Sequence, residues 1–157
     1  NRSEPTRASS SVWNSLSCGA THTCGIRSGS LYCWGSNEHG ELGLGLTSIS
    51  ESSPEFVPNA VDWRSVVAGR NFTCGIRGGN DDLYCFGIND FGQLGGPPEH
   101  YLEPYWVQTG RVRQVAVGYS HVCFVLAAAE SVRCMGSNLT GEVGIDNRVH
   151  DYAVIAE

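Results

Sequence analysis

A unit of about 50 residues occurs three times in this chain of 157 residues, and this repetition limits the possible folds more than any other feature. Cysteines and glycines recur at intervals of 49 to 52 residues. Each unit then carries a Cys-x-Gly-x-Asn segment and a Gly-x-apolar-Gly segment. The shared positions include Cys24, Cys74 and Cys123; Gly19, Gly69 and Gly118; Cys33, Cys85 and Cys134; Gly35, Gly87 and Gly136; and Asn37, Asn89 and Asn138.

Each unit is expected to form four short strands. The second unit shows short apolar or aromatic runs separated by turn residues, at 63–68, 72–76, 83–86 and 105–108. Pro54 and Pro104 stand just before the last strands of the first two units, as suits an outer edge strand, because proline cannot donate to a ladder. Residues 151–155 are expected to fill the same place in the third unit. No helical period is sustained, which predicts an all-β fold.

A four-stranded unit that repeats every 40 to 50 residues is typical of a β-propeller blade. The segments 23–26, 31–37, 40–43, 68–69, 86–89 and 92–95 resemble the repeat of the regulator of chromosome condensation family. The resemblance covers residues 12–157 and, with its paired cysteines, points to a secreted type. It implies a seven-bladed β-propeller. Relatives in the family include a chromatin-bound nucleotide-exchange factor, a protein inhibitor of β-lactamase and plant receptor-kinase ectodomains.

This sequence contains three repeats rather than seven. We expect an N-terminal segment at 1–11, which could be an outer strand of a preceding blade, followed by blades at 12–61, 62–110 and 111–157. Three blades cannot close a ring, so two blade faces stay open. The expected partners of these faces are further blades of the same protein or other copies of this chain. The fold is thus a partial seven-bladed propeller or an array completed by oligomerisation.

Six of the seven cysteines form pairs at matching repeat positions, on the second and third strands of each unit: Cys24 with Cys33, Cys74 with Cys85, and Cys123 with Cys134. Facing positions on antiparallel strands lie within disulfide reach. Each bond would stabilise the chain by roughly 2.5 to 3 kcal/mol. The alternatives are buried thiols or a zinc site, but no Cys-x-x-Cys or His spacing supports zinc. Disulfides predict an oxidising compartment.

Cys18 is the cysteine left over, and its equivalents are Ala68 and Val117. Those apolar equivalents predict a buried first-strand position. The two interpretations are an inert thiol and a bond to another chain or segment.

Three Asn-x-Ser/Thr sequons suggest a glycoprotein, at Asn1, Asn71 and Asn138. Asn71 is predicted to lie in an exposed turn between the first two strands of its unit. Asn138 occupies the repeated Asn position, where the alternative is a side chain that hydrogen-bonds the turn backbone. Together with the disulfides, these sequons favour a secreted or extracellular protein, possibly the ectodomain of a larger one.

Charge and motifs exclude several classes of function. The net charge is −6 and the chain contains no Lys, which argues against nucleic acid as a partner. No apolar run is long enough to span a membrane. No nucleophile, phosphate-loop or metal-ligand motif occurs, so we expect no enzyme, no metal and no cofactor. His22 and His121 share a repeat position that holds Phe72 in the second unit, which predicts a structural role.

The sequence therefore predicts a non-catalytic extracellular β-propeller-type module for macromolecular recognition or assembly. Tyr101, Tyr105 and Trp106 depart from the repeat and are a candidate contact surface for an unknown extracellular protein or glycan. One alternative is a self-assembling subunit of an extracellular filament, fibre or coat, because open faces that meet head to tail build rings or filaments. A second alternative is a carbohydrate-binding lectin.

Overall fold

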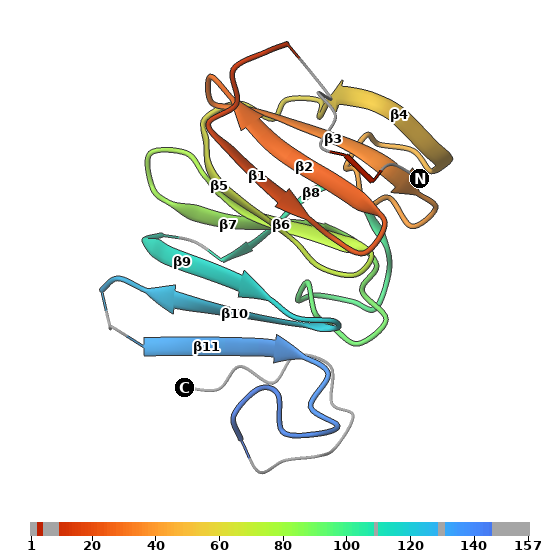
Figure 1. Ribbon diagram of the computed structural model, residues 1–157. Coiled ribbons are helices and arrows are strands. Elements are labelled where there is room, and N and C mark those ends of the chain that lie inside the picture. The colour runs from red at the N-terminus through yellow and green to blue at the C-terminus, as the bar shows by residue number, and fades with distance from the viewer. Residues whose placement is uncertain (1–2, 5–9, 109, 129–130, 146–157) are drawn as a thin grey trace.

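The computed structural model describes residues 3–4, 10–108, 110–128 and 131–145. These residues form eleven strands and no helix, arranged in three antiparallel sheets that we call the first, second and third blades (Figure 1). The first blade contains β1 (Ser15–Cys18), β2 (His22–Arg27), β3 (Ser30–Asn37) and β4 (Ser48–Phe56). The second contains β5 (Trp63–Ala68), β6 (Phe72–Arg77), β7 (Asp82–Gly87) and β8 (Tyr101–Gln108). The third contains β9 (Val112–Val117), β10 (His121–Leu126) and β11 (Ser131–Gly136).

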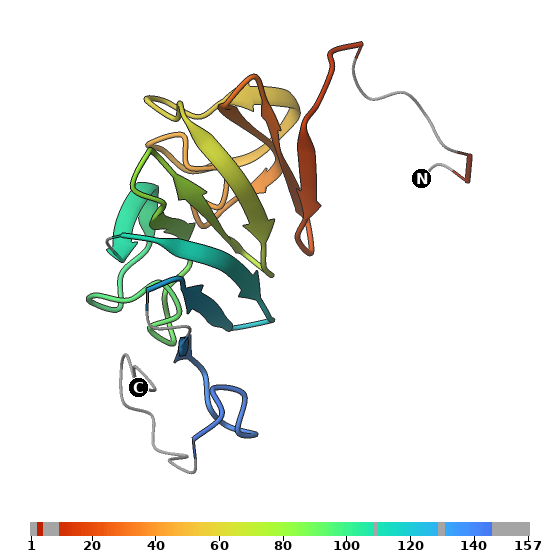
Figure 2. The same ribbon diagram turned by 90° about the vertical axis from the view of Figure 1, so that its left-hand side faces the viewer.

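The blades stack face to face in chain order, so that the second lies between the other two (Figures 1 and 2). Within the first two blades the strand order follows the sequence, from the innermost strand β1 or β5 to the outermost strand β4 or β8. The innermost strands of neighbouring blades contact one another. Buried apolar side chains fill both spaces between blades, and burial of this surface is the main force that holds the stack together.

The second and third strands of each blade form a hairpin in which the repeated cysteines stand directly opposite each other. The structure joins each pair by a disulfide with Cα atoms 4.1 Å apart: Cys24–Cys33, Cys74–Cys85 and Cys123–Cys134. These bonds lie where the repeat spacing predicts them.

A glycine ends each hairpin because a side chain there would collide with the preceding turn. Gly35 has a φ of +104°, and a Cβ on it would lie 2.5 Å from the carbonyl oxygen of Thr21. Gly87 and Gly136 repeat this geometry. The recurrence of glycine in the Cys-x-Gly-x-Asn segment therefore follows from a left-handed backbone and a close approach.

The outer strands differ from the prediction, because they begin earlier and contain the prolines. Pro104 lies inside β8, and Pro54 lies inside β4. In both strands the pairing register shifts next to the proline, between the partners of Cys33 and Gly35 in β3 and of Cys85 and Gly87 in β7. An irregular edge strand can include a residue that has no N–H to donate.

Two parts of the predicted organisation lie outside the described residues. They are the outer strand at 151–155 and most of the N-terminal segment at 1–11. Within the described part of the chain, no helix is long and apolar enough to cross a membrane.

Candidate interaction surfaces

A hydrogen-bonded chain of three residues joins the first blade to the second. The Nε2 atom of His22 lies 2.8 Å from the hydroxyl oxygen of Thr73, and that hydroxyl donates to the carbonyl oxygen of Glu41 at 2.8 Å. Because the single hydroxyl proton of Thr73 is used on Glu41, Nε2 of His22 must be the protonated nitrogen. Burial lowers the pKa of His22 to about 4, with a smaller opposing effect of Glu41, so the ring is neutral at pH 7.

At the joint between the second and third blades, apolar side chains replace those of His22 and Thr73. Phe72 stands at the position of His22, and Val122 at the position of Thr73; both are fully buried. Gln93 takes the place of Glu41. Equivalent positions therefore hold a hydrogen-bonded pair of side chains at the first joint and an apolar pair at the second.

Among the described residues, nothing covers one face of the first blade, whereas the first blade covers the equivalent face of the second. Leu16 is 58% exposed, whereas its equivalent Val66, which packs against the first blade, is 6% exposed. Trp13 is half-buried, although its equivalent Trp63 is buried. The aromatic side chains on this face pack among themselves: Trp13 lies 5.6 to 5.7 Å from Trp34 and Tyr32. We call this surface the first-blade face.

The third blade also has an open surface: the face that corresponds to those with which the first and second blades contact the next blade. We call it the third-blade face. Val132 is 57% exposed, whereas the equivalent side chains in the other blades, Leu31 and Leu83, are fully buried against the next blade. His121 and Cys123 on this face are half-buried. Each end of the described stack thus exposes apolar positions that are buried where two blades meet.

Cys18 is an exposed free thiol, and the prediction of a buried position is wrong. The sequence analogy with Ala68 is correct, but Cys18 lies on the first-blade face, which no blade covers among the described residues. The hydroxyl of Thr23 lies 3.7 Å from its sulfur.

The repeated Asn residues hold the loops that follow the hairpins. The side-chain oxygen of Asn37 accepts a hydrogen bond from the N–H of Leu42 at 3.2 Å, and its amide donates to the carbonyl of Leu46 at 2.9 Å. Asn89 makes the equivalent bonds. Asn138 is also buried, accepts from the N–H of Val143 and donates its amide to the carbonyl of Ile145. Asn138 thus makes the backbone hydrogen bonds that one of its two interpretations predicts, and its glycosylation stays a prediction.

The acidic residues of the same loops also have a structural role. A side-chain oxygen of Glu41 accepts a hydrogen bond from the backbone N–H of His39 at 2.8 Å, and Glu142 does the same for Thr140. Gln93 makes the equivalent bond to the N–H of Phe91 at 2.9 Å. A neutral side chain performs this task as well as a charged one, so the recurrence of Glu at this position needs no acid–base chemistry.

The outer strand β8 carries three aromatic residues, of which Trp106 follows the repeat rather than departing from it. Trp106 stands opposite Tyr84 of β7, as Phe56 stands opposite Tyr32 in the first blade. Tyr101 and Tyr105 are the true departures, because Glu51 and Glu55 occupy their positions in β4.

The two tyrosine rings stack 4.1 Å apart with planes inclined by 13°. Burial and the neighbouring Tyr105 raise the pKa of Tyr101 to about 12. Tyr105 is 37% and Trp106 49% exposed, so this strand exposes aromatic surface.

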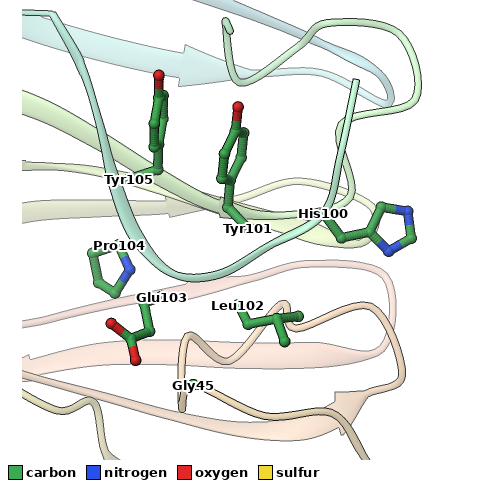
Figure 3. Close-up of a pocket in the computed structure, with 7 residues that line it drawn as sticks. All are labelled: Gly45, His100, Tyr101, Leu102, Glu103, Pro104 and Tyr105. Carbon is green, nitrogen blue, oxygen red and sulfur yellow. The ribbon is translucent and has the colours of Figure 1, made fainter. Parts of the chain in front are cut away.

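A shallow pocket of about 330 Å³ follows this strand and is lined by residues 100–105 and Gly45 (Figure 3). Tyr101 and Tyr105 point to one side of the strand, while Leu102 and Glu103 point to the other. The N–H of Gly45 donates to the carbonyl of Leu102 at 2.8 Å, which ties the strand to a loop of the first blade. In a catalytic site the reactive groups point toward one common point, whereas the side chains of this pocket do not. Among the described residues, no group of three or more His, Cys, Asp or Glu could hold a metal ion.

Comparison with known proteins agrees with this architecture. The model of the regulator of chromosome condensation (RCC1) repeat matches residues 28–76 and 80–125. The ultraviolet-B receptor UVR8 of Arabidopsis thaliana is 30% identical over 138 residues, which is 83% of this chain and 31% of the receptor. The chain therefore spans about a third of this relative's length.

Two solved structures share the fold. Prp20p of Saccharomyces cerevisiae superimposes with a TM-score of 0.76 at 20% identity, over 86% of this chain and 35% of that protein. The ectodomain of the Physcomitrella patens receptor kinase CR4 superimposes with a TM-score of 0.51 at 22% identity, over 81% of this chain and 28% of that one. Since the repeat model matches more than half of the residues and the blades have the same architecture, the chain belongs to the regulator of chromosome condensation repeat family of β-propellers.

Proposed function

We propose that this chain is a non-catalytic, extracellular β-propeller module that binds another protein through the outer rim of its second blade. The observation that carries the proposal is the pair of neighbouring aromatic side chains, Tyr105 and Trp106, exposed on an edge strand. Aromatic residues of this kind are enriched among the few that supply most of the energy of protein–protein interfaces. The loop carboxylates are used in backbone hydrogen bonds, which also favours binding over catalysis.

Known family members support a binding role without defining the partner. The structure of Prp20p was described together with the binding of that protein to Gsp1p and histones. The present chain is acidic and contains no Lys, which makes nucleic acid an unfavourable partner. A protein surface with basic or apolar groups would complement the exposed aromatic rim.

The extracellular location is supported by the disulfides. All six repeated cysteines are bonded within their hairpins, and stable structural disulfides are typical of secreted proteins and ectodomains. A receptor-kinase ectodomain with the same fold offers a precedent for propellers in that compartment.

Replacement of Trp106 by Ala tests the binding rim. We expect the chain, displayed against an array of purified ectodomains from its own source, to bind a protein partner. Trp106→Ala should weaken that binding about tenfold or more, because a central aromatic contact is lost. Phe91→Ala is the matched control, since Phe91 is also exposed but lies outside β8. Binding to a glycan array alone, or equal losses in both variants, would support the lectin alternative or another surface.

Native material should carry an N-linked glycan at Asn71 and none at Asn138. Asn71 lies in the turn between β5 and β6 and is half-buried, whereas Asn138 is buried with its amide bonded. Asn1 is outside the described residues. Intact mass before and after enzymatic deglycosylation, with Asn71→Gln as the control, measures this. An unmodified Asn71 in natively secreted protein would contradict the expectation and remove one support for secretion.

A further inference from the structure

We propose that a bulge in the outer strand β8 binds an arginine side chain of the partner protein. The guanidinium pairs with the carboxylate of Glu103 and stacks on the indole of Trp106. This site rests on the function proposed above and deepens it, because it names the chemistry that the rim of the second blade recognises. The shape of the bulge, the absence of internal partners for these two side chains and the charge of the rim all favour this ligand.

The bulge is a local break in the pairing of β7 with β8. Cys85 pairs with Tyr105. Gly87, two residues later in β7, pairs with Tyr101, which is four residues earlier in β8. Residues 102–104 therefore lie outside the regular ladder, and a bulge of this kind redirects side chains. The two tyrosines consequently lie side by side, and the side chains between them point away to the other side of the strand (Figure 3).

Glu103 and Trp106 lie on the side of the second blade that faces the first blade. A Cβ on Gly45, in a loop of the first blade, would be 2.8 Å from Oε1 of Glu103. Trp106 stands directly opposite Tyr84, which packs against the apolar cluster between the first two blades. Side chains that stand opposite each other in an antiparallel pair share one face of the sheet. The carboxylate and the indole therefore project from the same side of the strand.

Both side chains are accessible to a ligand. Trp106 is 49% exposed. Glu103 is also exposed and takes part in neither of the ion pairs that the described residues form. By contrast, Glu51 and Glu55 on the equivalent strand β4 each accept a hydrogen bond from a nearby serine. A ligand can therefore bind Glu103 and Trp106 without breaking a contact within the chain.

Arginine already binds aromatic rings at related positions of the blades. The guanidinium carbon of Arg27 lies 4.3 Å from the centre of the Tyr32 ring, and that of Arg77 lies 5.5 Å from the centre of the Tyr84 ring. Trp106 stands beside Tyr84 in the sheet, and no arginine among the described residues lies over its ring. Tryptophan attracts a cation more strongly than the other aromatic residues. The exposed indole thus provides a further position of this kind for an arginine of another protein.

The charge of the outer strands favours a basic ligand. The strands β4 and β8 contain Glu51, Glu55 and Glu103 and neither Arg nor Lys. The described arginines lie on other strands or in turns. A cationic segment of a partner therefore approaches a rim of opposite sign, which accelerates association and selects against anionic partners.

Arginine fits this site better than lysine. Its guanidinium is planar, so one face can stack on the indole while the N–H groups at its edge donate to both oxygens of a carboxylate. The ammonium of lysine is a compact and strongly hydrated charge. An exposed ion pair alone contributes little to affinity, so the stacking contact decides the preference between the two cations.

Short peptides test this chemistry directly. The probes are an acetylated and amidated peptide in which glycine alternates with arginine, and the same peptide with lysine in place of arginine. We expect the arginine peptide to bind about fivefold more tightly. Glu103→Gln and Trp106→Ala should each weaken its binding about fivefold. Glu51→Gln is the matched control and should change the affinity less than about twofold, because it removes a rim carboxylate that lies outside the bulge.

The indole N–H signal of Trp106 in an NMR spectrum of the isotopically labelled chain locates the contact. The loss of this signal in Trp106→Phe identifies it. It should shift when the arginine peptide is added, and shift less at the same concentration of the lysine peptide. The signal of Trp63 should stay in place, since that side chain is buried.

Equal affinities for the two peptides, or equal effects of Glu103→Gln and Glu51→Gln, would show attraction between net charges only and would overturn the arginine site. The protein partner of the rim separates this site from the function on which it rests. Weaker partner binding in both Trp106→Ala and Glu103→Gln would support the two together. A loss in Trp106→Ala alone would refute the arginine site and leave the binding rim intact, and a partner that neither variant weakens would refute both.

Discussion

Lowering the pH from 7.5 to 4.5 is expected to reduce the free energy of unfolding by about 2.5 kcal/mol through His22 alone. Burial against the second blade lowers the pKa of His22 from 6.5 to about 4 in the folded chain. In the unfolded chain the ring is solvated and its pKa returns to about 6.5. Between about pH 6.5 and pH 4, His22 is therefore mostly protonated in the unfolded chain and mostly neutral in the folded chain.

The sign follows from this difference in proton binding. Stability rises with pH wherever the unfolded state binds more protons, so the contribution of His22 is complete above about pH 6.5. It is lost progressively as the pH falls toward the folded pKa of about 4. Protonation would also place a positive ring beside the Thr73 hydroxyl in a space that excludes water.

Urea unfolding at pH 7.5, 5.5 and 4.5 measures the effect, with the variant His22→Phe/Thr73→Val as the control. This variant copies the Phe72 and Val122 pair that packs at the second joint, and it keeps every carboxylate of the chain. Its stability should fall less steeply with acid than that of the original chain. Parallel losses in the two proteins would show that His22 does not carry the pH dependence.

Removal of one hairpin disulfide should cost about 3 kcal/mol of unfolding free energy. In the variant Cys74→Ala/Cys85→Ala, the lost bond spans 11 residues between β6 and β7 at the centre of the stack. The unfolded chain gains the entropy of an open loop, and both cysteines are fully buried, so packing is lost as well. Cys18→Ser is the matched control and should change stability by less than about 0.5 kcal/mol, because its thiol is exposed and free.

Thermal and urea unfolding of the three proteins test this prediction under oxidising conditions. Addition of a reductant should bring the original chain to or below the stability of the double variant. Equal stability of the original chain and the double variant would mean that the hairpins gain nothing from their cross-links.

The repeat alone predicts the hairpins and their cysteine pairs, because both depend on local spacing that recurs three times. Cys24 and Cys33 are nine residues apart and face each other across one turn. The structural use of Asn37 and its equivalents could also be anticipated, since a short amide side chain readily bonds the backbone of a nearby loop. The prediction that Trp106 departs from the repeat is wrong, because its equivalent, Phe56, is recognised only when the outer strands are aligned by their pairing with the third strand.

Features that depend on contacts between blades could not be predicted from the sequence. The His22–Thr73 bond joins residues 51 positions apart, and the only hint was the recurrence of His at position 121. The outer strands begin earlier than expected because a register shift accommodates Pro104 within β8. The apolar equivalents Ala68 and Val117 predict a buried position for Cys18, but no blade precedes the first one among the described residues, and the thiol is exposed.

The assignment of these blades to an oxidising, extracellular setting depends most directly on the state of the cysteines in native protein. Peptide mapping without reduction should link Cys24 to Cys33, Cys74 to Cys85 and Cys123 to Cys134. The peptide that contains Cys18 should be either free or linked to a second chain, never to one of the six. Free thiols at the six hairpin positions in protein isolated under thiol-blocking conditions would contradict both the cross-linked blades and the extracellular function proposed for them.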